Sequence, residues 1–145
     1  MNKTTLAVAV ALIMGFTAVS ADKQKPANGA GGLVGTWQLV STKYGDAQDF
    51  TDYPADRVRL KMITATHFTW VDYPADSKKI ASAAGGPWTL DGEAYTETIE
   101  FVGEGMESYL GKKQTFKIKV EGDKLSQSGQ LSDGLKIEEV WRRAK

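Results

Sequence analysis

The chain has 145 residues, with 18 Lys and Arg against 18 Asp and Glu, one His and no Cys. This length fits about one domain, and the absence of Cys excludes disulfide frameworks, thiolate zinc sites and cysteine nucleophiles. The balanced charge argues against a nucleic-acid-binding surface, which needs a basic excess.

The first 21 residues have the three-part pattern of a cleavable secretory signal peptide. Lys3 gives a positive start, residues 6–16 form an apolar run, and Val19-Ser20-Ala21 fits a cleavage site. The run is shorter than the roughly twenty residues that a transmembrane helix needs. Because residue 22 is Asp and not Cys, we expect no lipid anchor. We therefore predict a signal peptide over 1–21, a flexible leader over 22–32, and a secreted or periplasmic protein with no stable membrane anchor.

From Leu33 onward the dominant hydrophobic period is two, which is typical of β-strands. The pattern predicts eight strands, over residues 33–42, 57–63, 67–73, 80–90, 95–101, 114–121, 124–131 and 135–143. Three pairs that accept the positive φ of tight hairpins separate some of these runs: Asp91-Gly92, Gly122-Asp123 and Asp133-Gly134. Residues 33–145 are therefore predicted to form one all-β domain, an eight-stranded antiparallel up-and-down barrel whose closure removes exposed edges.

The sequence Asp-Tyr-Pro-Ala-Asp occurs twice, at residues 52–56 and 72–76. The two copies could pair carboxylates around Ca²⁺, or they could form two turns, since Pro presets φ and Asp bonds nearby backbone. Neither copy has the oxygen density or the Gly spacing of a calcium loop, so we favour the turns.

The first predicted strand opens with Gly35-Thr36-Trp37, and the last ends with Trp141-Arg142-Arg143. This combination resembles the signature of the calycin superfamily, which includes lipocalins and fatty-acid-binding proteins. The sequence segments at residues 62–70, 95–100 and 134–141 are similar to segments of small secreted bacterial lipocalin-like proteins. The resemblance implies that Gly35, Trp37 and Arg143 form a structural signature at the closed end of the barrel, with Arg142 as the alternative to Arg143.

The chain departs from that pattern in two places. No helix is predicted after the last strand, and residues 44–56 read as a polar loop where fatty-acid-binding proteins have a helical lid. The ligand class of either group is therefore not transferred to this chain.

Alternation also sorts each strand into an inner and an outer face, and we take the apolar parity as the inner one. On the strand over 57–63, Val58, Leu60 and Met62 alternate with Arg57, Arg59 and Lys61.

Three polar residues fall on an otherwise apolar parity: Glu97, Gln127 and Glu139. Because a buried carboxylate is costly unless it is paired, we expect a partner such as Arg59, His67, a Tyr, water or a ligand. The alternatives are an error of parity, a wet barrel end, or a β-bulge that reverses the face.

His67 is the only side chain whose ordinary pKa lies near neutrality. It could ligate haem, as a single His does in some small β-barrels, or it could be a surface residue beside the turn at 64–66. We favour the surface residue and predict no cofactor and no metal. Large aromatic side chains could line a pocket or fill the core: Trp37, Phe68, Trp70, Trp88, Tyr95, Phe101, Phe116 and Trp141.

The leading functional hypothesis is extracytoplasmic binding or transport of a small hydrophobic or amphipathic molecule in the barrel cavity. The predicted ligand-binding residues are Trp70, Tyr95, Glu97, Ile99, Phe116, Ile118, Gln127 and Glu139. One alternative is a small barrel enzyme, an isomerase, cyclase or hydrolase, with Glu97 and Glu139 as acid and base. Another is a noncatalytic structural or interaction module with a solid core.

Overall fold

A computed structural model describes residues 32–145. The predicted signal peptide over 1–21 and nearly all of the leader over 22–32 lie outside the described residues. Within residues 32–145, no helix is both long enough and apolar enough to span a membrane.

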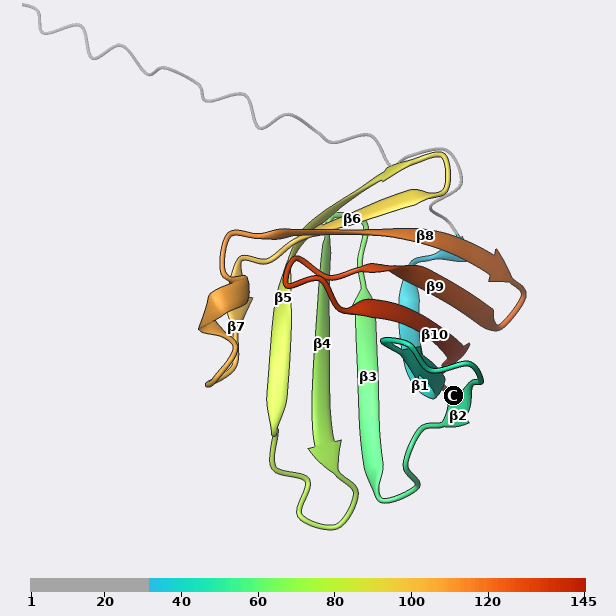
Figure 1. The fold of residues 1–145 in the computed structure, drawn as a ribbon, viewed down its shortest axis with the longest axis vertical. Coiled ribbons are helices and arrows are strands. Elements are labelled where there is room, and N and C mark those ends of the chain that lie inside the picture. The colour runs from blue at the N-terminus through green and yellow to red at the C-terminus, as the bar shows by residue number, and fades with distance from the viewer. Residues whose placement is uncertain (1–31) are drawn as a thin grey trace, which may run out of the picture.

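The described residues form an antiparallel β-barrel (Figure 1). The strands are β1 (Gly35–Tyr44), β2 (Thr51–Asp52), β3 (Arg57–Ile63), β4 (His67–Pro74), β5 (Ser82–Asp91), β6 (Ala94–Thr98), β7 (Phe101–Val102), β8 (Lys113–Glu121), β9 (Lys124–Gln130) and β10 (Lys136–Arg143), with a short 3₁₀ helix η2 (Glu107–Tyr109). The eight long strands pair in chain order, and β10 returns to pair with β1. The predicted all-β barrel of eight strands is confirmed; the two short strands β2 and β7 were not predicted.

Tight turns join strands that are consecutive in the chain, so that these strands pair with each other. Gly92 and Gly122 have φ of 59° and 58°, the left-handed conformation that their turns require.

The two Asp-Tyr-Pro-Ala-Asp segments form neighbouring turns, and the Ala75 amide donates to the Asp56 carbonyl over 2.8 Å. Within residues 32–145, no group of His, Cys, Asp and Glu is arranged to hold a metal ion.

A cation stacked on a tryptophan closes one end of the barrel. The Arg143 guanidinium carbon lies 4.2 Å from the centroid of the Trp37 ring, and Trp37 is fully buried. Arg143 also donates hydrogen bonds to the carbonyls of Gly32 and Val34. Arg142, the alternative, is exposed on the outer face. Gly35 is favoured here, because its φ of 143° is one that other residues rarely adopt and a Cβ there would displace the Arg143 guanidinium.

The inner face of β3 is the reverse of the prediction. Lys61 pairs with Trp37 on β1 and with Trp70 on β4, and residues directly opposite each other in an antiparallel pair share a face. Lys61 is therefore inside and only 2% exposed, together with Arg59, whereas Val58, Leu60 and Met62 lie half-buried on the outer face. The alternation of side-chain types shows that the two faces of a strand differ, but not which face points into the barrel. The register with the neighbouring strands decides which face is the inner one.

Phe101 is a second correction. Tyr95, Glu97 and Ile99 point inward as the alternation predicts, but Phe101 is 49% exposed. β6 ends at Thr98, and the chain crosses β5 so closely that the Glu100 amide donates to the Gly85 carbonyl over 2.8 Å. Gly85 and Gly86 permit this crossing, because a Cβ on either would collide with the Phe101 ring or the Thr98 carbonyl. The other large aromatic side chains of the predicted set lie inside the barrel.

Candidate functional site

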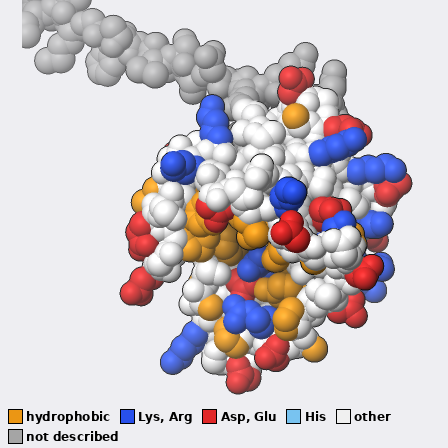
Figure 2. All heavy atoms as spheres, viewed as in Figure 1, with side chains coloured by type: hydrophobic (Ala, Val, Ile, Leu, Met, Phe, Trp, Pro, Cys, Tyr) orange, Lys and Arg blue, Asp and Glu red, His pale blue; other side chains and the backbone are white. Residues whose placement is uncertain are grey.

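The barrel interior contains a cavity of about 300 Å³ that is partly open to solvent. Its apolar wall includes Trp70, Ile99, Phe116, Ile137 and Trp141. Figure 2 shows the hollow, in which hydrophobic side chains gather around charged ones. The volume lies at the lower end of the roughly 300–1,000 Å³ typical of small-molecule pockets. The interior is therefore not the solid core that a purely structural module predicts.

Six of the eight predicted ligand-binding residues line this cavity: Trp70, Glu97, Ile99, Phe116, Gln127 and Glu139. Tyr95 and Ile118 do not, which corrects their predicted placement. Tyr95 is 1% exposed and packs on Trp88 with ring centroids 5.5 Å apart, while Ile118 is 7% exposed in the core beside the cavity. Both side chains point into the barrel, as expected, but they pack in the core at positions that do not border the cavity. A ligand-binding role for the lining residues stays a prediction.

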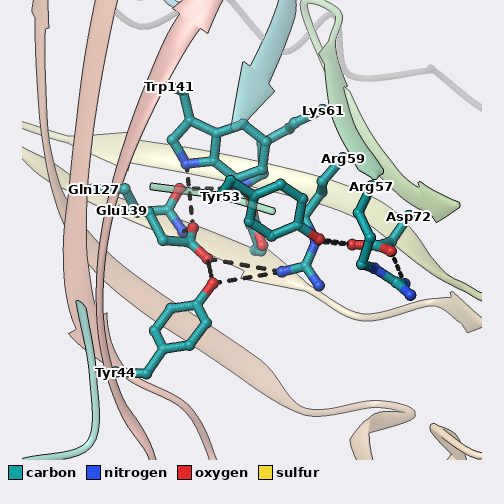
Figure 3. A network of polar contacts seen from close by, with 10 residues as sticks. Tyr44, Tyr53, Arg57, Arg59, Lys61, Asp72, Gln127, Glu139 and Trp141 are labelled. Carbon is teal, nitrogen blue, oxygen red and sulfur yellow. Dashed lines mark hydrogen bonds and ion pairs between the residues drawn. The ribbon is translucent and has the colours of Figure 1, made fainter. Parts of the chain in front are cut away.

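A buried lysine connects the polar residues of the cavity. The Lys61 ammonium donates to Glu97 Oε1 over 2.9 Å and to Gln127 Oε1 over 2.9 Å. Gln127 in turn donates to Glu139 Oε2 over 3.3 Å. The three polar residues on inner parities, on β6, β9 and β10, are thus joined into one network through Lys61 on β3. Figure 3 shows Lys61, Gln127 and Glu139 of this network.

Glu139 accepts hydrogen bonds from three side chains. Besides Gln127, the Tyr44 hydroxyl donates to Oε1 over 2.5 Å and the Trp141 indole donates to Oε2 over 3.2 Å. The Arg59 guanidinium lies 4.0 Å from Oε1. Both carboxylate oxygens of Glu139 are therefore engaged by side-chain donors.

Tyr44 enters the cavity because β1 contains a β-bulge. Pairing with β10 shifts register between Leu39 and Ser41, so the inner face changes from Trp37 and Leu39 to Thr42 and Tyr44. The carbonyl of Val40, the extra residue, accepts the Tyr53 amide over 2.9 Å.

A second cluster surrounds Asp72, which is fully buried on β4. Arg59 donates to its Oδ2 over 2.8 Å, and both Tyr53 and Arg57 donate to the same carboxylate. Arg59 also lies over Trp70 and Tyr53, with its guanidinium carbon 5.1 and 5.5 Å from the ring centroids. Arg59 therefore connects the Asp72 cluster to Glu139 (Figure 3).

Burial and pairing shift the pKa values of these groups in different directions. Burial raises the pKa of the Glu97 carboxyl, and the neighbouring Lys61 ammonium offsets only part of that effect. Burial would also raise the pKa of Asp72, but its hydrogen bonds from Tyr53 and Arg57 and the charge of Arg59 outweigh it and lower the pKa. Burial, and then the charge of Glu139, raise the pKa of Tyr44 far above its ordinary value.

The cavity rim is built from two segments. Met106 and Tyr109 come from the connection between β7 and β8, while Leu131 and Leu135 come from the turn between β9 and β10. The Tyr109 hydroxyl donates to Asp133 Oδ2 over 2.5 Å and so joins the two segments.

The predicted set of ligand-binding residues omits apolar lining residues such as Ile137 and Trp141. Within the polar network, Lys61 and Tyr44 are the ionisable side chains that the sequence prediction does not place in the site, and Arg59 enters it only as an expected partner. The available signal was a balance of charges, because three inward acidic or amide residues require inward donors and β3 carries three basic residues at period two. His67, the other proposed partner, lies exposed with Nδ1 2.8 Å from Thr66 Oγ1 and does not line the cavity.

No protein-family model and no curated protein matches the chain. Among solved structures, it is similar to a lipocalin-like protein from Bacteroides uniformis, with a TM-score of 0.57 and 19% identity over 79% of this chain and 100% of that chain. It is also similar to an uncharacterised protein from Bacteroides eggerthii, with a TM-score of 0.53 and 17% identity over 77% of this chain and 98% of that chain. The chain therefore has a lipocalin-like barrel fold, which confirms the fold that the sequence resemblance implied.

Proposed function

We propose that this protein binds, and carries outside the cytoplasm, a small apolar or amphipathic molecule held in the barrel cavity. The observation that supports this proposal is the cavity of about 300 Å³, whose walls are apolar while its polar groups converge on one network. Pockets with mainly apolar walls and a few convergent polar groups are typical of small-molecule binding.

A ligand screen tests the binding. The protein is mixed with fatty acids, sterols, aromatic metabolites and haem, and complexes are read by native mass spectrometry and thermal shift. At least one class is expected to bind with one molecule per chain. If no class binds or shifts the melting temperature, the proposal is overturned.

A cavity-filling variant locates the binding. Ala84 is 1% exposed and lines the cavity, so Ala84→Leu fills part of the space and is expected to weaken binding strongly. Ala94→Leu is the matched control, because Ala94 is exposed at the start of β6. Equal loss of binding in both variants would contradict a site inside the barrel.

The extracytoplasmic part of the proposal depends on the N-terminal sequence pattern. The full chain is produced in a Gram-negative bacterial host, and the mature protein is recovered from periplasm or medium and its mass measured. Cleavage after Ala21, giving Asp22 as the first residue, is expected. An uncleaved chain retained in the cytoplasm would contradict this location.

A further inference from the structure

We infer that the ligand of this cavity carries an uncharged head group with a hydrogen-bond donor beside an acceptor, for which a carboxamide is the simplest chemistry, placed against Lys61 and Glu97. This inference depends on the proposed function, because it specifies the class of molecule that the same cavity takes.

The first argument is that the charges lining the cavity already balance. The lining cations are Arg59 and Lys61, and the lining carboxylates are Glu97 and Glu139. Lys61 lies 2.9 Å from Glu97, and Arg59 lies 4.0 Å from Glu139. Behind the lining, Arg59 also pairs with Asp72 over 2.8 Å. A carboxylate or ammonium group on the ligand would therefore bring a buried charge with no free counterion, which is costly.

The second argument is that hydrogen-bonding capacity remains beside the Lys61–Glu97 pair. An ammonium has three N–H donors, and those of Lys61 reach two acceptors among residues 32–145. Glu97 Oε1 accepts from Lys61, whereas no side chain among residues 32–145 makes a full hydrogen bond to Oε2. The Tyr95 hydroxyl, buried beside Glu97, also has no hydrogen-bond partner among these residues and is the neighbouring donor for this carboxylate. One donor on Lys61 and one acceptor on Glu97, two side chains that are in direct contact, are thus available together at the cavity wall.

A carboxamide matches that pair. Its carbonyl oxygen would accept from the Lys61 ammonium, and its N–H would donate to Glu97 Oε2, so that no charge is added. A hydroxyl can also donate and accept, but from one oxygen atom, whereas a carboxamide presents separate oxygen and nitrogen atoms to the two partners. The ammonium lies 5.0 Å from the centroid of the Trp141 ring, so the head group would sit next to this aromatic wall. The apolar body would then lie along Trp70, Ile99 and Phe116.

A series of ligands with one chain length and different head groups tests the inference. Octanamide, octanoate and octylammonium are titrated into the protein at neutral pH by calorimetry and native mass spectrometry. Octanamide is expected to bind roughly tenfold or more tightly than either charged member, because an unpaired buried charge costs more than a satisfied neutral group. Octanoate or octylammonium binding as tightly as octanamide would overturn the head-group inference and leave the proposed function standing. If nothing in this series or in the wider screen binds, both are overturned.

A charge variant gives a second readout. Glu97→Gln leaves Lys61 without its carboxylate, so the ratio of octanoate to octanamide affinity is expected to rise by roughly tenfold. Glu100→Gln is the matched control, because Glu100 is exposed near the same strand, and its ratio should stay that of the unmodified protein. An unchanged ratio in folded Glu97→Gln would overturn the inference. If circular dichroism shows that Glu97→Gln is unfolded, the ranking in the unmodified protein decides.

Discussion

Tyr44 reaches Glu139 only because β1 contains one extra residue at the bulge. Removing the hydroxyl in Tyr44→Phe takes one of the donors from a buried carboxylate and keeps the ring. We expect the free energy of unfolding to fall by about 1.5–3 kcal/mol, the usual contribution of a hydrogen bond to a charged group. Urea denaturation followed by tryptophan fluorescence measures the change.

Tyr73→Phe is the control for this substitution. Tyr73 is half-buried on the outer side of β4, and its hydroxyl makes no side-chain hydrogen bond with residues 32–145. Its loss should change stability by much less. Equal effects of the two substitutions would mean that the Tyr44 bond to Glu139 contributes nothing measurable.

At Gly86, stability is expected to depend on the absence of a single side-chain atom, the Cβ. Its φ is 157°, and a Cβ there would collide with the Thr98 carbonyl oxygen, which is backbone and cannot rotate away. Gly86→Ala is therefore expected to destabilise the barrel by more than the roughly 1 kcal/mol usual for Ala at a positive-φ position. Thermal unfolding followed by circular dichroism measures it.

The matched variant is Gly92→Ala. Gly92 also has positive φ, at 59°, but nothing lies within 4 Å of the added Cβ. The difference between the two variants isolates the collision from the backbone conformation. If Gly92→Ala were as damaging as Gly86→Ala, close packing of β5 against the end of β6 would not be the cause.

At the scale of strands, Lys61 on β3 and Glu97 on β6 form a buried ion pair inside the barrel. The side chains of Lys61 and Glu97 are 2% and 4% exposed and lie 2.9 Å apart. Lys61→Met or Glu97→Leu alone leaves a buried charge unpaired and should cost about 3–5 kcal/mol. The double variant removes both charges and is expected to cost less than the sum of the single variants by about 2 kcal/mol or more. A double-mutant cycle of urea denaturation measures this coupling.

The control cycle uses Lys117 and Glu93, whose 3.2 Å contact is largely exposed, at 72% and 62%. Solvent screens that pair, so its coupling should be much weaker. Additive effects of Lys61→Met and Glu97→Leu would contradict the view that the two charges stabilise each other inside the barrel.

The strands themselves could be predicted from period two and turn residues, but their inner faces only in part. On β10, Ile137 and Trp141 identify the face on which Glu139 lies, and the structure agrees. On β3, both parities are plausible, because aliphatic residues occupy one and long basic residues the other. The bulge in β1 leaves no local mark that distinguishes Val40 from its neighbours. The missed part of the polar network, Lys61 and Tyr44, comes from these two strands, since cross-strand register and bulges depend on contacts distant in the sequence.

For the whole molecule, the Asp72 cluster makes stability depend on pH. Because the folded-state pKa of Asp72 lies below its ordinary value of 3.8, its contribution is present above that pH and is lost as pH falls through the folded value. Asp72→Asn should be less stable than the unmodified protein near neutrality. The difference in free energy of unfolding should narrow on acidification from about pH 5 to about pH 2. Urea denaturation at several pH values measures it.

Asp49→Asn serves as the control, because it removes one carboxylate from an exposed position. Its stability difference from the unmodified protein should stay small across the same range. Glu97, with a raised pKa, acts in the opposite sense and loses its contribution as pH rises, but it is present in all three proteins. A difference for Asp72→Asn that stays constant with pH would contradict the role of the cluster.

Folding cannot close this barrel until its last strand is available, because β1 pairs with β10 and Trp37 lies opposite Arg143. Contacts between distant parts of a chain carry the largest loop-closure entropy and slow folding. During synthesis, one edge of β1 therefore stays unpaired, and the inward charges of β3 stay uncovered, until β10 has been made. A chain that ends before β10 exposes two open edges, so its characteristic failure would be edge-to-edge association rather than a smaller folded barrel.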